Sequence, residues 1–289
     1  DLINLKFLLH CFKIPDMKFF SMVVLGVLSL AGSSFAFETQ SRALNLILDR
    51  AKQLVSEHKI PVMISDLDET VIDSLPRRYK QHQAAANVFC KEKAQERSVE
   101  ELALCERVLG VSQKDFYLLK NGYSTPELFE RIGIDPDSEF VKGFKEVRKK
   151  FYPLYVDQDG SMPGAITYFR ELKKIGAELF YVSARSVGIE DSYLSVIKLG
   201  FIDSNERNHV FLNTDKLKTI EFKEKTVELI KKQLPSNAEV IGLFENESDN
   251  LAKWKESFPK AKMIFVRGNS SQEGPNRPTF KMSAINDYR

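Results

Sequence analysis

Short apolar runs alternate with amphipathic stretches along much of the chain. Three runs bounded by turn or polar residues have the composition of strands buried on both faces of a sheet, at 61–65, 178–182 and 239–244. Two shorter runs predict further strands, at 209–212 and 262–266. Helical spacing of apolar residues fills the intervals, over 39–57, 163–174, 189–199, 224–234 and 250–258. This alternation predicts an α/β fold with a doubly wound parallel sheet.

One stretch interrupts the alternation. From Leu75 to about Tyr155 the pattern contains no convincing strand and instead predicts charged helices, at 77–95, 98–109, 123–132 and 138–151. We interpret residues 76–155 as a helical cap inserted after the first core strand, and we expect this insertion to govern the choice of substrate. The predicted core then consists of two segments, 37–75 and 156–289.

The N-terminal segment has the pattern of a secretory signal and not of the fold. A cationic start at Met17 is followed by an apolar run over 22–31 that is too short to span a bilayer comfortably. Small residues precede a predicted cleavage after Ala36. We therefore expect a signal peptide over 17–36, no membrane anchor after cleavage, and a secreted or periplasmic protein. Residues 1–16 are interpreted as an upstream extension.

Charge and cysteine content narrow the possible partners. The 42 basic and 40 acidic residues leave a net charge of +2. This small excess of positive charge does not indicate a nucleic-acid-binding protein. Cys11 falls in the upstream extension, so Cys90 and Cys105 remain in the mature chain. An even number of cysteines in an exported protein favours a disulfide, here closing a helical hairpin. The alternative is two independent buried thiols.

Chemistry-bearing residues follow the first predicted strand. Ligands of open parallel sheets bind at the carboxyl ends of the strands, where Asp66 and Asp68 stand. If the backbone leaves extended geometry between them, both carboxylates face one pocket and offer a nucleophile, a proton donor and metal-binding oxygens. Carboxylates so close together also predict a bound divalent cation, because their mutual repulsion is costly. The alternative is a surface turn.

Two other strand ends carry polar residues. At one of them, we predict a binding site for phosphoryl oxygens, formed by the Ser183 hydroxyl and the amides of Ala184 and Arg185. The alternative is that Ser183 serves only as a helix cap, as a serine before a helix often does. Glu245 and Asp249 are four residues apart and predict oxygen ligands for a hard cation. A solvated acidic loop is the alternative for this second segment.

A side-chain cation is also expected, to offset phosphoryl charge. Lys225 opens the helix predicted before the strand at 239–244, and three neighbouring lysines compete with it, Lys216, Lys218 and Lys223. The motifs of three other kinds of site are absent from the sequence. The chain contains no Gly-x-Ser-x-Gly elbow of a serine hydrolase, no Gly-rich phosphate loop ending in Lys-Ser or Lys-Thr, and no histidines in zinc-ligand spacing.

Together these motifs resemble the haloacid dehalogenase superfamily, and within it the secreted acid phosphatases of bacteria, of the subfamily III type. The run from Asp66 to Thr70 matches the first family motif, and residues 180–185 are similar to the second, phosphate-binding motif. Lys225 precedes Glu245 by a spacing similar to that between the family's lysine and its last acidic motif. The segment 162–165 also resembles this branch.

The resemblance covers residues 60–70 and 162–266, and it implies a magnesium-dependent phosphomonoester hydrolase acting on a small-molecule phosphate ester. Asp66 would attack phosphorus and form an aspartyl-phosphate. Asp68, kept partly protonated by crowding with Asp66, would protonate the leaving alcohol and later activate water. Thr70 would orient Asp68.

The resemblance also implies how the ligands are held. Mg²⁺ would be bound by the Asp66 carboxylate, the Asp68 backbone carbonyl, Glu245 and Asp249. Phosphoryl oxygens would be bound by Ser183, Ala184, Thr70 and Lys225. Arg185 would contact the substrate.

Glu245 departs from the family pattern, which usually places Asp at this position. The extra methylene shifts the carboxylate by about 1.5 Å. If that shift abolishes metal binding, the alternative function is a non-catalytic secreted protein with a degenerate metal site, which acts through its helical insertion.

Overall fold

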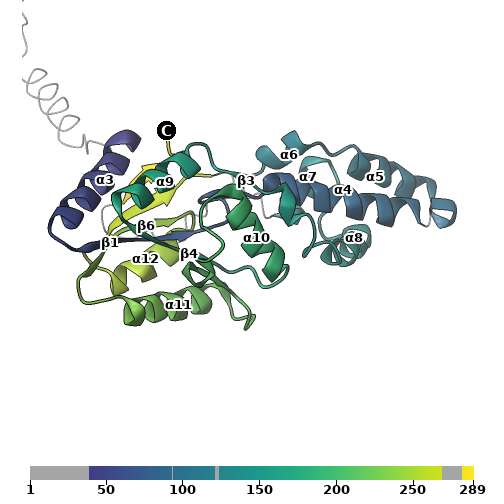
Figure 1. Ribbon diagram of the computed structural model, residues 1–289. Coiled ribbons are helices and arrows are strands. Elements are labelled where there is room, and N and C mark those ends of the chain that lie inside the picture. The colour runs from purple at the N-terminus through teal and green to yellow at the C-terminus, as the bar shows by residue number, and fades with distance from the viewer. Residues whose placement is uncertain (1–38, 93, 121–123, 269–281) are drawn as a thin grey trace, which may run out of the picture. The chain divides into compact units, whose positions relative to one another are not determined.

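The computed structural model describes residues 39–92, 94–120, 124–268 and 282–289 (Figure 1). The predicted signal peptide and upstream extension lie outside these residues. Residues Thr39–Arg289 form one compact unit. Within the described ranges, no helix combines the length and the apolar character needed to cross a bilayer.

A six-stranded parallel sheet forms the centre of this unit and confirms the predicted fold class. Its strand order is β5-β4-β1-β6-β7-β8, and each neighbouring pair is parallel. The strands are β1 (Ile60–Asp66), β4 (Glu178–Ser183), β5 (Val210–Leu212), β6 (Ala238–Glu245), β7 (Lys262–Val266) and β8 (Ser283–Ile285). Because β1 lies between β4 and β6, the carboxyl ends of these three strands meet at one edge of the sheet.

Three short strands were not expected from the sequence. The edge strand β8 has only three residues and no apolar run that would reveal it. The two-residue strands β2 (Ile72–Asp73) and β3 (Gly160–Ser161) pair antiparallel in a separate small sheet. Such short pairings leave no periodicity in the sequence, because they depend on the partner segment and not on local pattern.

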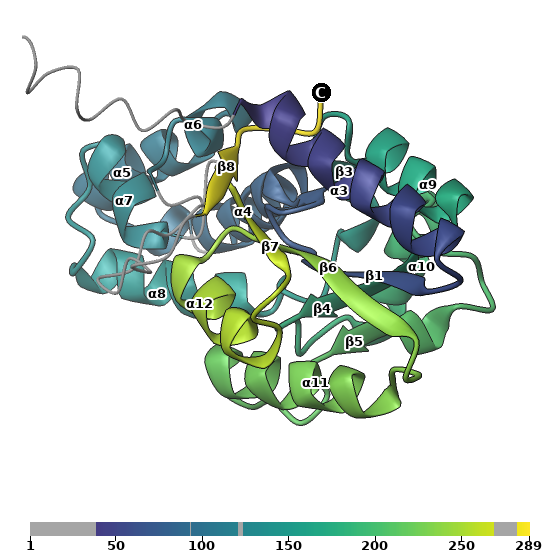
Figure 2. The same ribbon diagram turned by 90° about the vertical axis from the view of Figure 1, so that its left-hand side faces the viewer.

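Helices cover both faces of the six-stranded sheet (Figure 2). One face packs against α3 (Gln40–Ser56), α9 (Ala165–Ile175) and α10 (Ile189–Leu199), and the other against α11 (Thr219–Gln233) and α12 (Ser248–Ser257). Alternate strand residues serve the two faces: Met63 packs on the α9 side, while Val62 and Ile64 pack on the α11 side. Strands buried on both faces explain why these runs are continuously apolar.

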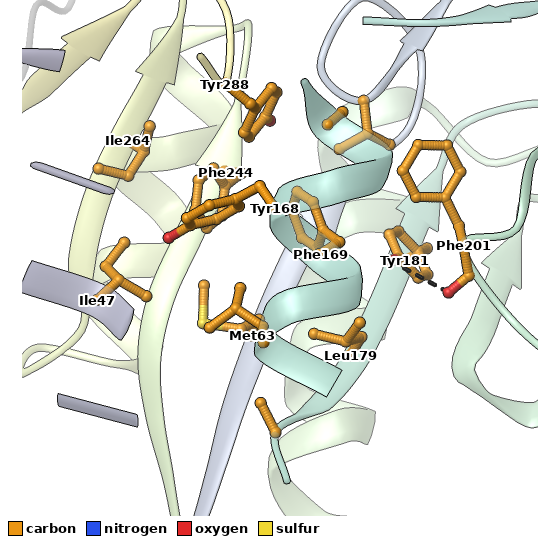
Figure 3. Close-up of a cluster of buried hydrophobic side chains, with 14 of the residues drawn as sticks. Ile47, Met63, Tyr168, Phe169, Leu179, Tyr181, Phe201, Phe244, Ile264 and Tyr288 are labelled. Carbon is orange, nitrogen blue, oxygen red and sulfur yellow. Dashed lines mark hydrogen bonds between the residues drawn. The ribbon is translucent and has the colours of Figure 1, made fainter. Parts of the chain in front are cut away.

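Aromatic residues fill the core on the α9 side (Figure 3). Phe169 of α9 lies edge-on to Phe244 of β6, with ring centroids 5.3 Å apart, and Tyr168 stacks near Tyr288 at 5.7 Å. The Tyr181 hydroxyl donates to the Phe201 carbonyl across 3.5 Å. The Tyr168 contact ties Tyr288, the penultimate residue of the chain, into this aromatic layer.

In the described part of the chain, five α-helices and two 3-10 helices lie between the small strands β2 and β3, and the five α-helices are drawn together on the right of Figure 1. These helices are α4 (Leu75–Lys91), α5 (Val99–Leu109), α6 (Gln113–Tyr117), α7 (Thr125–Arg131) and α8 (Glu139–Lys149). Helices α4, α5, α7 and α8 share an apolar core to which Phe129 and Phe144 contribute, and Phe116 of α6 belongs to a second apolar cluster with Leu75 and Leu128. A disulfide joins Cys90 in α4 to Cys105 in α5, with Cα atoms 5.5 Å apart, and this confirms the predicted hairpin bond.

Candidate active site

The turn after β1 brings the two predicted aspartates to one cavity. β1 ends at Asp66, and the amides of Val71 and Ile72 both donate to the Leu67 carbonyl, at 3.0 and 2.8 Å. Glu69 closes the turn with a φ of +58°, a left-handed conformation that is unusual for a residue with a side chain. The backbone therefore leaves extended geometry after Asp66, which is the condition under which both carboxylates were predicted to share a pocket, and Asp66 and Asp68 line the same cavity.

The cavity lies at the carboxyl edge of the sheet, between the strand ends and the helical insertion. Its volume is about 440 Å³, which lies within the range of small-molecule sites. The sheet side contributes Asp66, Asp68, Ser183, Ala184, Arg185, Lys223, Asn246 and Glu247. The insertion side contributes Arg77, Arg78, Gln81, Thr125, Arg148 and nearby Tyr152.

Lys223, and not Lys225, is the lysine of this site. Its Nζ donates to Asp66 Oδ1 at 2.8 Å and to Glu245 Oε2 at 2.7 Å, and the side chain is only 5% exposed. Lys225 instead pairs with Asp215 at 3.2 Å, and 66% of its side chain is exposed. The prediction of Lys225 was therefore wrong, and the competitor Lys223 takes its place.

The error has a geometric origin in helix α11. The helix begins at Thr219, five residues before the predicted start at 224, so Lys223 already lies inside it. Residues two apart on a helix point about 200° from each other. Lys223 thus shares the buried face with Thr226 and Val227, and Lys225 points to solvent.

Glu245 uses both carboxylate oxygens in hydrogen bonds within the protein. Oε2 accepts from Lys223, and Oε1 accepts from the amides of Asn246 and Glu247 at 3.0 and 3.1 Å. The residue is fully buried at the end of β6. The longer side chain therefore reaches the lysine and the following turn, so in this arrangement it positions Lys223 instead of presenting a free oxygen to a cation.

Burial shifts the ionisation of this charged cluster. Burial raises the pKa of Asp66 despite the opposing charge of Lys223, and the nearby Asp68 carboxylate adds to the rise. Burial likewise raises the pKa of Glu245, with repulsion from Asp66 as the next cause. Burial alone would lower the pKa of Lys223, but the two carboxylates raise it above its ordinary value. One buried cation thus faces two buried carboxylates, so the cluster favours a further positive charge or a bound proton.

Asp68 is held by two arginines. Arg185 donates to both of its oxygens, at 2.6 and 2.8 Å, and Arg77 of α4 donates to Oδ1 at 3.0 Å. Asp159 pairs with the same arginines, at 2.8 Å from Arg185 and 3.2 Å from Arg77. Although burial opposes ionisation, Arg185 and then Arg77 hold the pKa of Asp68 well below its ordinary value. The expectation that crowding keeps Asp68 partly protonated was therefore wrong, because the arginines outweigh the repulsion from Asp66.

The remaining phosphate-site candidates occupy different positions. Ser183 Oγ lies 3.2 Å from Asp68 Oδ2 and accepts from the Arg185 amide at 3.3 Å, and both Ser183 and Ala184 line the cavity. Helix α10 begins at Ile189, where the sequence predicted it, so residues 184–188 separate Ser183 from the helix N-terminus.

Thr70 is fully buried, and it is not among the residues that line the cavity. Its Oγ1 lies 3.1 Å from Asp66 Oδ2 and 3.2 Å from Asn246 Oδ1. The single hydroxyl proton can serve one of these acceptors at a time. The structure therefore corrects its predicted role: Thr70 orients Asp66, not Asp68, and it does not face a phosphate.

Oxygen atoms at the sheet edge fit a magnesium ion in part. Asp249 Oδ1 is buried without a hydrogen-bond partner, which is costly unless a ligand satisfies it. Within the described residues, no three His, Cys, Asp or Glu side chains converge as a ready cation cage. Magnesium does not require one, because it is commonly held by one or two carboxylates, waters and substrate phosphate oxygens. Asp66 can supply one such oxygen, Oδ2, which lies 3.1 Å from the Thr70 hydroxyl, while its Oδ1 accepts from Lys223. Asp249 can supply Oδ1 from the first turn of α12, although Asp249 is not among the residues that line the cavity. The carboxylate of Asp68 is held by arginine, and both oxygens of Glu245 already accept hydrogen bonds.

Several residues of the site could not be predicted from sequence pattern alone. Arg77 lies in the first turn of α4 and Asp159 in the short segment before β3, so neither follows a strand of the main sheet. Asn246 and Glu247, by contrast, come directly after β6, and their position alone could have drawn attention to them.

Comparison with known proteins gives likeness to solved structures only. No protein-family model matches the chain, and no curated protein matches it. A Bacteroides fragilis protein named provisionally as a haloacid dehalogenase-like hydrolase is 15% identical, over 78% of this chain and 96% of its own, with a TM-score of 0.43. One from Burkholderia xenovorans LB400, named in the same way, is 15% identical over 80% and 94%, with a TM-score of 0.44.

A third structure is a haloacid dehalogenase family hydrolase from Deinococcus radiodurans R1 with bound phosphate and sodium. It is 14% identical over 75% of this chain and 85% of its own, with a TM-score of 0.42. Haloacid dehalogenase-like hydrolases are thus among the solved structures to which this chain is similar, at identities that leave its chemistry to be argued from its own residues.

Proposed function

We propose that this chain is a phosphomonoester hydrolase that acts on small-molecule phosphate esters, with Asp66 as the nucleophile. The observation that carries the proposal is the buried arrangement of Asp66 and Lys223 at the floor of the cavity, where Lys223 Nζ lies 2.8 Å from Asp66 Oδ1. A carboxylate at a strand end, oriented by one cation and one hydroxyl, is poised to attack rather than to stabilise the fold.

Each residue of the sheet edge has a part in phosphoryl transfer. Asp66 attacks phosphorus, the bond to the leaving oxygen breaks, and an aspartyl-phosphate forms that water then hydrolyses. Lys223 offsets the charge on the transferring oxygens, and Glu245 holds Lys223 in place through a 2.7 Å hydrogen bond. Thr70 fixes the orientation of the attacking carboxylate. Phosphoryl transfer depends mainly on such positioning and charge neutralisation.

Asp68 serves as the proton carrier only after its ion pairs loosen. In its ionised form it can accept a proton from the water that attacks the aspartyl-phosphate. To protonate a leaving alcohol, Asp68 must first take up a proton from solvent, which becomes favourable once Arg185 or Arg77 turns toward the substrate, whose phosphate competes for the same guanidinium groups. Ser183 and the backbone around Ala184 line the side of the cavity where the phosphoryl oxygens would lie.

Mg²⁺ fits this site as the proposed cofactor, held by Asp66 and Asp249. When bound, it supplies positive charge that lowers repulsion between the phosphate and the attacking carboxylate. Asp249 contributes its buried, unpartnered Oδ1, and Asp66 presents its Oδ2 beside the Thr70 hydroxyl. Glu245 acts through Lys223 instead, which departs from the ligand set expected from the family resemblance.

Magnesium titration followed by calorimetry, paired with an assay on p-nitrophenyl phosphate, tests the proposal. We expect binding at millimolar concentrations or below, turnover that disappears with a chelator, and loss of binding in Asp249→Asn. A chain that binds no magnesium and hydrolyses no ester would overturn the proposal and favour the non-catalytic alternative. Glu100→Asn is a suitable control, because Glu100 is exposed on α5 in the insertion.

We also propose that the protein is exported. The signal-like pattern over 17–36 and the disulfide between Cys90 and Cys105 both support an oxidising destination. Expression of the chain in a bacterial host, followed by N-terminal sequencing of the periplasmic fraction, should give a mature start at Phe37. Retention of an intact, reduced chain in the cytoplasm would contradict export.

A further inference from the structure

The lining of the cavity is rich in arginine. Helix α4 contributes Arg77 and Arg78, helix α8 contributes Arg148, and Arg185 joins them from the loop after β4. All four are buried or nearly so. Burying several guanidinium groups is costly unless anions accompany them.

Two of these arginines have their counter-charges within the protein. Arg77 and Arg185 share the carboxylates of Asp68 and Asp159, at distances between 2.6 and 3.2 Å. Two cations and two anions balance locally. This pair therefore belongs to the phosphoryl-transfer site described above and does not call for another ligand.

Arg148 is different. It is only 6% exposed, its Nη1 donates to Thr125 Oγ1, and its Nε is buried without a hydrogen-bond partner. Across the described ranges, no carboxylate lies within ion-pair distance of its guanidinium, and the Tyr152 ring at 5.9 Å is its π contact. Burial lowers the pKa of Arg148 to about 10, and repulsion from Arg78 contributes. The group remains charged at neutral pH, so a buried cation faces the cavity without a protein anion.

We propose that Arg148, with Thr125 and Tyr152, forms a second anion subsite, and that the substrate is a phosphomonoester carrying another anionic group at its far end. This inference rests on the proposed function and names the substrate class for it. The cavity volume of about 440 Å³ leaves room beyond a single phosphate. A carboxylate or a second phosphate matches the fork of a guanidinium, and both would be recognised by the same chemistry.

The placement of the subsite supports a role in specificity. Arg148 lies near the end of α8 in the insertion, whereas Asp66 and Lys223 belong to the sheet core. Gln81 fixes the adjoining loop by donating to the carbonyls of Tyr152 and Leu154, both at 3.1 Å. A substrate bound at both ends would therefore bridge the insertion and the core across one cavity.

A panel of four esters tests the inference on the purified full chain. p-Nitrophenyl phosphate and glycerol 1-phosphate have uncharged tails, 3-phosphoglycerate carries a carboxylate, and 1,3-propanediol bisphosphate carries a second phosphate. We expect kcat/KM in the wild type to be about 30-fold or more higher for at least one ester with a charged tail than for glycerol 1-phosphate. The two charged esters separate a carboxylate subsite from a phosphate subsite.

Arg148→Met should collapse that ratio, and Arg148→Lys should retain part of it. Lys149→Met is the matched control, because Lys149 is the next residue of α8 but is exposed and pairs with Glu146. A wild-type ratio near one, or an equal ratio in Arg148→Met and Lys149→Met, would overturn the second subsite. If no ester is hydrolysed at all, including p-nitrophenyl phosphate, the proposed function itself fails. The wild-type ratio decides the question even if Arg148→Met does not fold.

Discussion

The two sides of the cavity carry opposite imbalances of charge. At the sheet edge, Asp66 and Glu245 share a single lysine, and Asp249 keeps one buried oxygen without a partner. On the side of the insertion, Arg148 is buried without a carboxylate in ion-pair distance among the described residues. The sheet edge therefore favours an added cation and the insertion an added anion. The proposed phosphate ester, bound together with a metal ion, would satisfy both sides of the cavity.

The largest effect should come from removing the nucleophile at the sheet edge. Asp66→Asn keeps the shape of the side chain but removes its charge, so hydrolysis of p-nitrophenyl phosphate should fall by about 10⁴-fold or more. Asp215→Asn is the control, because Asp215 is exposed and pairs only with Lys225 among the ion pairs described. If Asp66→Asn hydrolysed the ester about as fast as the control does, the assignment of Asp66 as the nucleophile would be contradicted.

The two lysines of α11 sharpen the contrast between buried and exposed charge. Lys223→Met removes the cation between Asp66 and Glu245, so kcat/KM should fall by about 10²- to 10³-fold. The free energy of unfolding should also fall by about 3–5 kcal/mol, because buried carboxylates lose their partner. Lys225→Met should leave both within experimental error, since its ion pair is exposed. Urea unfolding and steady-state kinetics on both variants measure the difference, and equal effects would contradict the placement of Lys223.

The insertion and the sheet core should respond differently to loss of the disulfide. A closed loop of 15 residues contributes about 3 kcal/mol, and the bond lies wholly between α4 and α5. In a Cys90→Ser, Cys105→Ser double variant, hydrogen exchange should speed up in α4 and α5. Trp254, the single tryptophan and a residue of the sheet core, should keep its native fluorescence. Simultaneous loss of both signals would show that the two regions unfold as one.

The smallest effect concerns the turn that joins the two regions. Burial raises the pKa of Glu69 to about 7, although its Oε1 accepts from the Ser74 amide and hydroxyl. A carboxyl with a raised folded pKa binds more protons when folded than when unfolded between about pH 4.5 and 7. Stability therefore falls as pH rises through that window, by at most about 1.4 kcal/mol per pH unit from this group.

Glu69→Gln should make that fall shallower, because the amide keeps the acceptor oxygen and does not titrate. Denaturant unfolding at several pH values measures the slope. Glu100→Gln, an exposed change on α5, should leave the slope as in the wild type. An unchanged slope in Glu69→Gln would mean that Glu69 is not the titrating group.

The sheet and its strand ends followed from the sequence because their signals are local. Continuous apolar runs identify strands buried on both faces, and parallel topology then brings Asp66, Ser183 and Glu245 to one edge. The disulfide was predictable for a similar reason, since the two cysteines flank a helical hairpin. These features depend on the pattern within a segment and on one topological rule.

The partners of the site residues did not follow, because they depend on helix phase and on tertiary contacts. An error of five residues in the start of α11 exchanged Lys223 for Lys225. Arg185 and Arg77 keep Asp68 ionised. Arg77 belongs to the insertion, and the hydrophobic pattern of the sequence does not predict how the insertion packs against the core. Thr70 turned out to orient Asp66 because the turn at Glu69 adopts a left-handed conformation that propensity does not predict.

Covalent capture tests the central claim most directly. The full chain is mixed with p-nitrophenyl phosphate and magnesium, quenched in acid within the first turnovers, digested, and examined by mass spectrometry. We predict that the peptide containing Asp66 gains the mass of one phosphoryl group, that the label disappears as substrate is exhausted, and that Asp66→Asn carries none. Steady hydrolysis with no phosphorylated peptide, or a label on another residue, would contradict the account.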